Sequence, residues 1–200
     1  MGSAKLRPAD RLNRDILATK FEIENEEVFH LKNLYKLVHE WLVDEGFNAV
    51  DGKSDDKFET LYLDHTKADG AKEHHIWWRT IQAPRDNSYY RYFLKIDWQT
   101  LNMKSIEIMH KGQKFKTNKG DVIIRIEAWL QLDYQDKWLK SPLLRIFEGW
   151  FRQRFYLERI KSYKHDLYLT AFRLHTTIKQ YLQLKAPVDW GRSFHPEKGI

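Results

Sequence analysis

The segment Ser141 to Lys185 constrains the fold more than any other part of the chain. It contains no proline after Pro142 and no glycine after Gly149. Because serine caps helices well and proline fits the first helical position, the sequence predicts a helix that begins at Ser141. A continuous helix of this length would run roughly 65 Å at ~1.5 Å per residue. A compact domain of 200 residues is only about 40 Å across, so the helix must bend back or project.

The same segment carries the positive excess of the whole protein. It holds nine lysine and arginine residues against three acidic residues, a balance equal to the +6 net charge of the full chain. Arg145, Arg152 and Arg159 recur every seven residues, and Arg173 continues the series. Because the forked guanidinium suits phosphate, these four are predicted anion-binding or nucleic-acid-binding residues. A core helix with a solvated basic face fits the pattern as well, and so does a helix lying on a membrane.

An apolar seam with nearly heptad spacing runs along the second half of this segment. Its clearest members are Leu167, Ala171, Leu174 and Ile178. The seam is longer than one small sheet is expected to cover. These four residues are therefore predicted to form an interface with another protein chain.

The rest of the chain predicts an α+β fold. Apolar residues at helical spacing predict one N-terminal helix from Asn25 to Gly46, with Asn25 as its cap. The middle of the chain alternates apolar and polar residues and predicts an antiparallel meander sheet of five or six strands. The clearest strand spans 122–132, where every second residue from Val122 to Leu132 is apolar and should face the core. The long C-terminal amphipathic helical region completes the fold.

The expected organisation has four parts. Residues 1–24 are polar and predict an N-terminal arm, and residues 25–140 form the α+β body. Residues 141–185 form the long basic amphipathic helix, and residues 186–200 form an irregular tail rich in proline and glycine.

One predicted hairpin brings histidines together. Asp69-Gly70 is a strong two-residue turn, and it would set His65 opposite His74 and Asp64 opposite His75. Adjacent strand residues point to opposite faces, so these two pairs cannot form one site. Two ligands on a face are too few for structural zinc. No metal is therefore expected there.

No catalytic residue, cofactor or metal is predicted anywhere in the chain. There is no cysteine, which excludes thiolate metal sites and cysteine nucleophiles. No nucleotide-binding, metalloprotease or nucleophile-elbow motif occurs. The N-terminus lacks the apolar core of a signal peptide, and no run is long enough to span a bilayer. The expected location is intracellular, or within a virion.

Two resemblances bear on function. The first rests on Gly70-Ala71-Lys72-Glu73, Ile76-Trp77-Trp78-Arg79, Met109-His110-Lys111-Gly112 and Asn118-Lys119-Gly120. These stretches resemble uncharacterised proteins of small-genome archaea over most of residues 28–185, a likeness that implies no activity. The second rests on an opening helix, 33–42, that ends at Gly46 and precedes long antiparallel hairpins. This order is similar to tail-terminator and neck subunits of tailed viruses over about residues 28–132, although the long terminal helix departs from it.

These observations predict a non-enzymatic assembly subunit of a larger protein complex, such as a virion or a tail- or neck-like structure. It would dock through its long C-terminal helix and bind other protein subunits, identical or different. One alternative is a nucleic-acid-binding module that uses the arginines of that helix. Another is a peripheral membrane protein that uses the same helix.

Overall fold

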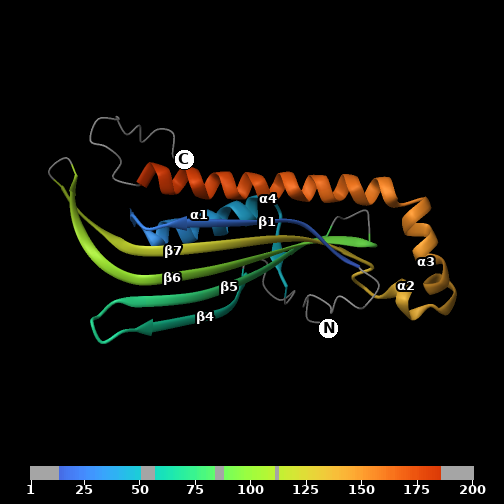
Figure 1. Cartoon of the computed structure of the whole chain (residues 1–200), viewed down its shortest axis with the longest axis horizontal. Coiled ribbons are helices and arrows are strands. Elements are labelled where there is room, and N and C mark those ends of the chain that lie inside the picture. The colour runs from blue at the N-terminus through green and yellow to red at the C-terminus, as the bar shows by residue number, and fades with distance from the viewer. Residues whose placement is uncertain (1–13, 51–56, 84–87, 111–112, 186–200) are drawn as a thin grey trace.

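The computed structural model describes residues 14–50, 57–83, 88–110 and 113–185. It shows an α+β fold in which a seven-stranded antiparallel sheet is covered on one face by two helices (Figure 1). The strands are β1 (Asp15–Asn25), β2 (Val28–Phe29), β3 (Asn48–Ala49), β4 (Glu59–Thr66), β5 (Lys72–Gln82), β6 (Tyr90–His110) and β7 (Gln113–Leu132). The helices are α1 (Leu31–Asp44), α2 (Lys137–Lys140), α3 (Pro142–Arg154) and α4 (Leu157–Lys185).

The sheet follows the order β1-β7-β6-β5-β3, with β2 paired to β7 and β4 paired to β5. The predicted meander is therefore correct for β4 to β7, where each strand pairs with the next in sequence. The prediction of an N-terminal arm is wrong for residues 15–24. These residues form β1, which runs antiparallel to β7 from Asp15↔Gln131 to Asn25↔Val122. Residues 1–13 and the predicted tail, 186–200, lie outside the described residues.

Helix α1 begins later than the sequence predicted. Asn25 ends β1, and the short strand Val28–Phe29 pairs with β7 before the helix starts. His30 is the N-cap instead, and its Nδ1 accepts a hydrogen bond from the backbone N–H of Asn33 at 3.3 Å. The predicted stop at Gly46 is correct. This glycine has φ +79°, a left-handed conformation that suits a residue without a side chain at a helix C-terminus.

The β4–β5 hairpin has a different register from the predicted one. Lys67 N–H donates to the carbonyl of Ala71 at 2.8 Å, so the loop has three residues rather than two. Gly70, with φ +78°, takes the left-handed position that such a loop requires. The extra residue shifts the pairing by one position, so Asp64 lies opposite His74 and His65 lies opposite Glu73. The predicted His65–His74 and Asp64–His75 pairs are therefore wrong.

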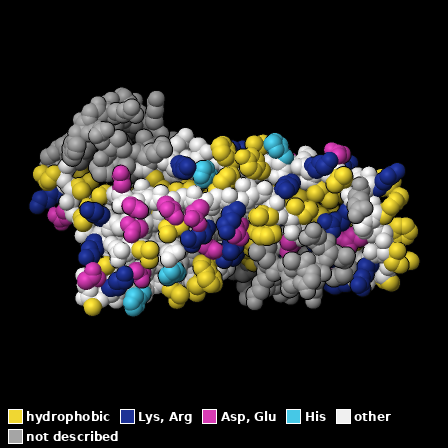
Figure 2. Space-filling view, viewed as in Figure 1, with side chains coloured by type: hydrophobic (Ala, Val, Ile, Leu, Met, Phe, Trp, Pro, Cys, Tyr) yellow, Lys and Arg dark blue, Asp and Glu magenta, His cyan; other side chains and the backbone are white. Residues whose placement is uncertain are grey.

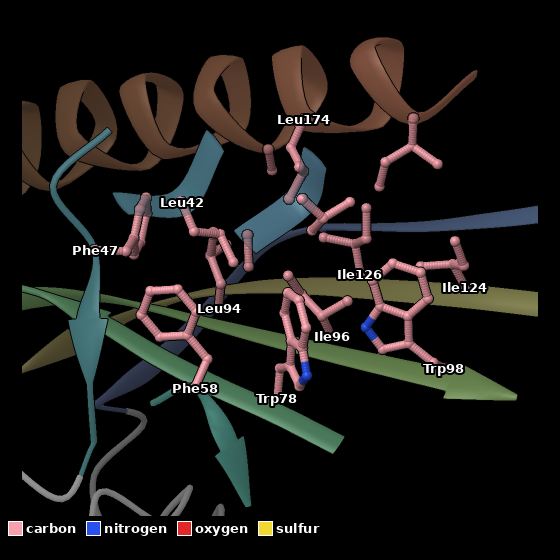
Figure 3. Packing of buried hydrophobic residues seen from close by; sticks show 14 of the residues in the cluster. Leu42, Phe47, Phe58, Trp78, Leu94, Ile96, Trp98, Ile124, Ile126 and Leu174 are labelled. Carbon is pink, nitrogen blue, oxygen red and sulfur yellow. The ribbon is translucent and has the colours of Figure 1, made fainter. Parts of the chain in front are cut away.

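The buried face of β7 is as predicted. Its inward residues are at most 1% exposed: Val122, Ile124, Ile126, Ala128, Leu130 and Leu132. They pack with the aromatic residues of β5 and β6 beneath α1 and α4 (Figure 3). Full burial of one large apolar side chain contributes about 1.5–3 kcal/mol, so this layer supplies much of the stability of the fold.

The predicted helix 141–185 is two helices rather than one. Helix α3 ends at Arg154, and α4 leaves in a different direction after Phe155 and Tyr156 (Figure 1). The backbone N–H groups of Phe155 and Tyr156 both donate to the carbonyl of Phe151, which closes α3 and turns the chain. The turn buries the Tyr156 ring, which stacks on Phe151 with ring centroids 5.3 Å apart.

The seam of α4 is core. Leu167, Ala171, Leu174 and Ile178 are fully buried within the same chain, facing the sheet. Figure 3 shows Leu174 pointing from α4 toward the sheet, near Ile126. The prediction that these four residues form an interface with another chain is therefore wrong. That prediction assumed a small sheet, but β6 and β7 have 21 and 20 residues and are long enough to cover α4.

Candidate functional site

The position of α3 is fixed by a buried charge cluster. Arg14 precedes β1, and its side chain is only 2% exposed. Its guanidinium forms an ion pair with Asp133 at 3.0 Å and a second one with Glu148 of α3. Asp136 lies 3.7 Å away as a third carboxylate. Breaking a buried ion pair is costly, so this cluster holds the end of the sheet, the segment after it and α3 in one arrangement.

The loop after β7 is shaped to bring these carboxylates together. Asp133 and Asp136 have positive φ angles, +45° and +57°, which aspartate tolerates better than most residues. Asp133 also accepts a hydrogen bond from the backbone N–H of Trp138 at 3.1 Å, which secures the start of α2. Burial, with the nearby Glu148 carboxylate adding to it, raises the pKa of the neighbouring Tyr89 phenol.

Aromatic rings also pack against the face of α3 that carries Glu148. Trp138 of α2 packs on Phe151 with centroids 4.8 Å apart, and both rings contact Tyr89. Together with Glu148, Phe151 therefore marks the face of α3 that looks toward the body.

The opposite face of α3 is apolar and exposed. Leu143, Ile146, Phe147 and Trp150 are 70%, 77%, 56% and 57% exposed. They lie at i, i+3, i+4 and i+7, so they form one ridge along the helix, which we name the apolar ridge. A single exposed apolar residue is ordinary, but four along one face of a helix make a candidate interaction surface. A usual surface helix buries its apolar face and exposes its charged residues. Helix α3 does the opposite: it buries Glu148 and exposes its large apolar residues.

Aromatic residues extend the apolar ridge at its C-terminal end. Phe155 is 63% exposed and lies edge-on to Trp150, with ring centroids 4.9 Å apart. The ridge therefore continues around the corner between α3 and α4. Figure 2 shows hydrophobic and basic side chains together at this end of the molecule.

Exposed basic side chains lie at the same end of the molecule as the apolar ridge (Figure 2). We name the following set the basic rim: Lys137, Lys140, Arg145 and Arg154. Residues 137–164 contain eight basic and two acidic residues. Of the two acids, Glu148 is buried against Arg14 and Glu158 is paired with Lys161 at 2.8 Å. This end of the molecule therefore presents net positive charge together with the apolar ridge.

The four predicted anion-binding arginines do not form one stripe. Arg145 is exposed on α3, whereas Arg152 lies half-buried, where its charge acts on the Tyr89 phenol. Arg159 belongs to α4 and lies over the Tyr156 ring at 5.8 Å. Arg173 is far along α4 and forms an ion pair with Glu45 at 2.7 Å. The break between α3 and α4 is the reason, because the seven-residue repeat assumed one straight helix.

On the open face of the sheet, acidic and basic side chains pair with one another, both across strands and along one strand. Asp97 of β6 binds Arg79 of β5 at 2.6 Å and Lys95 of its own strand at 3.3 Å, and Glu127 of β7 binds Lys20 of β1 at 3.3 Å. Such a network is typical of the solvated face of an antiparallel sheet.

The described residues hold no group of three histidine, aspartate or glutamate side chains placed to bind a metal ion. No described helix is long and apolar enough to cross a membrane. The chain matches no known family model, and no curated protein is significantly similar to it.

Sequence reasoning missed the residues that make this site. The spacing of Leu143, Ile146, Phe147 and Trp150 indicates an amphipathic helix, but the apolar face of such a helix is normally assigned to the core. The signal against that assignment was Glu148 on the other face, which only becomes an inward residue once Arg14 is known to meet it. That contact joins residues 134 positions apart, and no local pattern reveals it.

Proposed function

We propose that this protein is a non-enzymatic docking subunit that attaches to a larger structure through the apolar ridge of α3. The observation that carries the proposal is the reversed orientation of this helix. Its glutamate is buried in an ion pair, and its large apolar side chains face solvent. Exposing these side chains is unfavourable, so a partner that covers them gains free energy.

The architecture supports docking by a preformed surface. The Arg14 cluster and the packing of Trp138 on Phe151 hold α3 from behind, so the helix cannot roll its ridge into the body without breaking a buried ion pair. A partner therefore meets a fixed surface and does not need to order it, which lowers the entropy cost of binding. The buried carboxylates are engaged by Arg14, which supports a structural role for them.

The alternative of a nucleic-acid-binding module has lost its main support. It relied on Arg145, Arg152 and Arg159 forming one stripe, and these arginines are divided between two helices with Arg152 turned inward. Positive charge at this end of the molecule remains, but the exposed face of α3 is apolar. A helix built to contact phosphates would place polar side chains there instead.

Fractionation of the full-length protein in the cells that produce it tests the proposal. The unmodified protein should run with a high-mass or sedimentable fraction, and Ile146→Asp should move it to the size of the free chain. Leu169→Asp is the matched control, because Leu169 is an exposed apolar residue on α4 and the charge change is the same. If Ile146→Asp fractionates like the unmodified protein, α3 is not the docking surface.

A further inference from the structure

Resting on the proposed function, we infer that the partner of the apolar ridge is an anionic lipid surface, on which α3 lies flat. Its apolar ridge would enter the boundary between headgroups and acyl chains while the basic rim contacts acidic headgroups. The argument has three steps, taken from the charge, the residue types and the placement of α3.

Charge repulsion argues against a second copy of this chain as the partner. A symmetric contact between two α3 helices would bury both ridges, but it would also bring together the positively charged ends of both copies. Residues 137–164 carry eight basic and two acidic residues, and Glu148 is already occupied by Arg14. Like charges facing each other across an interface are destabilising. A partner with negative charge would instead complement this end of the molecule.

The residue types favour lipid over an acidic protein. Protein interfaces are depleted in lysine, whereas lysine and arginine beside an apolar helical face are typical of helices that lie in the membrane interface. Two exposed lysines, Lys137 and Lys140, belong to the basic rim. Trp150 and Phe155 form an edge-on aromatic pair at the end of the ridge. Tryptophan prefers the headgroup level of a bilayer, where its ring is partly apolar and partly wet.

The placement of α3 suits an extended flat partner. The helix stands at one end of an elongated body, turned relative to α4 (Figure 1). Its inner face is held by Glu148 and Phe151, so the ridge points away from the rest of the protein. The body would therefore stand off the bilayer without hindering contact. The helix has 13 residues, fewer than the ~20 needed to span the hydrocarbon core, so it would lie on the surface.

The test is co-sedimentation of the purified full chain with vesicles. One set is phosphatidylcholine alone, and the other contains about one third phosphatidylserine, the anionic headgroup that attracts basic residues. Binding should be strong to the anionic set and weak to the neutral set, and should fall as salt is added. Arg154 follows Trp150 by four residues and is exposed, so it lies on the ridge side of α3. Arg154→Ala should lower partitioning about fivefold, the effect expected for one basic residue near an anionic surface.

Ile146→Asp should abolish binding to anionic vesicles, and Leu169→Asp should leave it unchanged. Equal thermal stability of these two variants and the unmodified protein ensures that folding is not the cause. Absence of binding to anionic vesicles would overturn the inference. Retained binding by Ile146→Asp would do so as well, because it would show adsorption by charge alone.

The two proposals can fail separately. If the vesicles do not bind, yet Ile146→Asp still releases the protein from its high-mass fraction in cells, the docking surface stands and its partner is a protein. If Ile146→Asp has no effect in cells, the proposed function fails irrespective of what the vesicles show.

Discussion

Arg14 and Glu148, 134 residues apart in sequence, form a buried ion pair that fixes which side of α3 faces the body. The apolar ridge faces solvent because of this contact. Leu143, Ile146, Phe147 and Trp150 occupy the side of the helix opposite the glutamate. The candidate site is therefore a consequence of one long-range electrostatic contact, and its integrity can be tested through that contact.

Glu148→Ala should lower the free energy of unfolding by about 3 kcal/mol, because it leaves the Arg14 guanidinium buried with one fewer carboxylate. Urea denaturation followed by circular dichroism measures this change. Glu158→Ala is the control. Glu158 pairs with Lys161 but is 83% exposed, so its loss should cost less than about 1 kcal/mol. Equal effects of the two substitutions would show that the Arg14 cluster does not anchor α3.

Gly120→Ala should destabilise the protein more than Gly70→Ala. Both glycines have positive φ angles, +154° and +78°. At Gly120 an added Cβ would also lie 2.9 Å from the carbonyl oxygen of Leu101 and 2.9 Å from the Cα of Met103, both backbone atoms. At Gly70 nothing lies within 4 Å. The cost at Gly70 should be about 1 kcal/mol from the backbone conformation alone, and thermal melts of both variants give the comparison.

The sequence predicted those elements whose causes are local. Alternation along 122–132 identified the buried face of β7, and Gly46 identified the end of α1, because a helix C-terminus in the left-handed conformation favours glycine. The hairpin at Asp69-Gly70 was located correctly, but its register depended on whether the loop has two or three residues. Both loop lengths accept glycine at the second of these positions.

The remaining predictions failed where the answer depended on distant residues. Asn25 resembled a helix cap, but its pairing with Val122 of β7 keeps it in a strand. The seam of Leu167 and Leu174 was read correctly as apolar, but its partner was assigned to another chain because the size of the sheet was unknown. The orientation of α3 required the Arg14–Glu148 contact, which no periodicity in either segment encodes.

Protonation of His74 should destabilise the fold at mildly acidic pH. Burial lowers the pKa of His74, and the Asp64 carboxylate opposes the shift only partly. The ring lies opposite Asp64 on β4, and its Nδ1 forms a hydrogen bond with Thr100 Oγ1 at 2.7 Å. Because the unfolded chain binds the proton more readily, the contribution of His74 is complete above the unfolded pKa of about 6.5. It is lost as the pH falls below that value.

Urea denaturation near pH 7.5 and near pH 5.5, on either side of an ordinary histidine pKa, measures the effect. The loss of stability on acidification should be smaller in His74→Gln than in the unmodified protein. His65→Gln is the control, because His65 is exposed on the same hairpin. If both variants lose as much stability as the unmodified protein, burial of His74 does not contribute to the pH dependence.

Leu174→Asp should unfold the protein, rather than release an otherwise intact body from a complex. Leu174 is fully buried between α4 and the sheet, where an ionised carboxylate would have no partner, and Figure 3 shows the apolar side chains around it. Burying an unpaired charge belongs to the most destabilising class of substitution, typically above about 4 kcal/mol. Circular dichroism and size-exclusion chromatography of the purified variant distinguish unfolding from dissociation.

Phe172→Asp is the control for that substitution, since Phe172 lies two residues away on the same helix and is 45% exposed. It should keep the native circular dichroism spectrum and most of the thermal stability, because an exposed carboxylate remains hydrated. A folded Leu174→Asp variant with an unchanged melting temperature and only an altered oligomeric state would restore the seam of α4 as an interface. Unfolding by Leu174→Asp, with Phe172→Asp remaining native, would show that the seam of α4 belongs to the core of this chain.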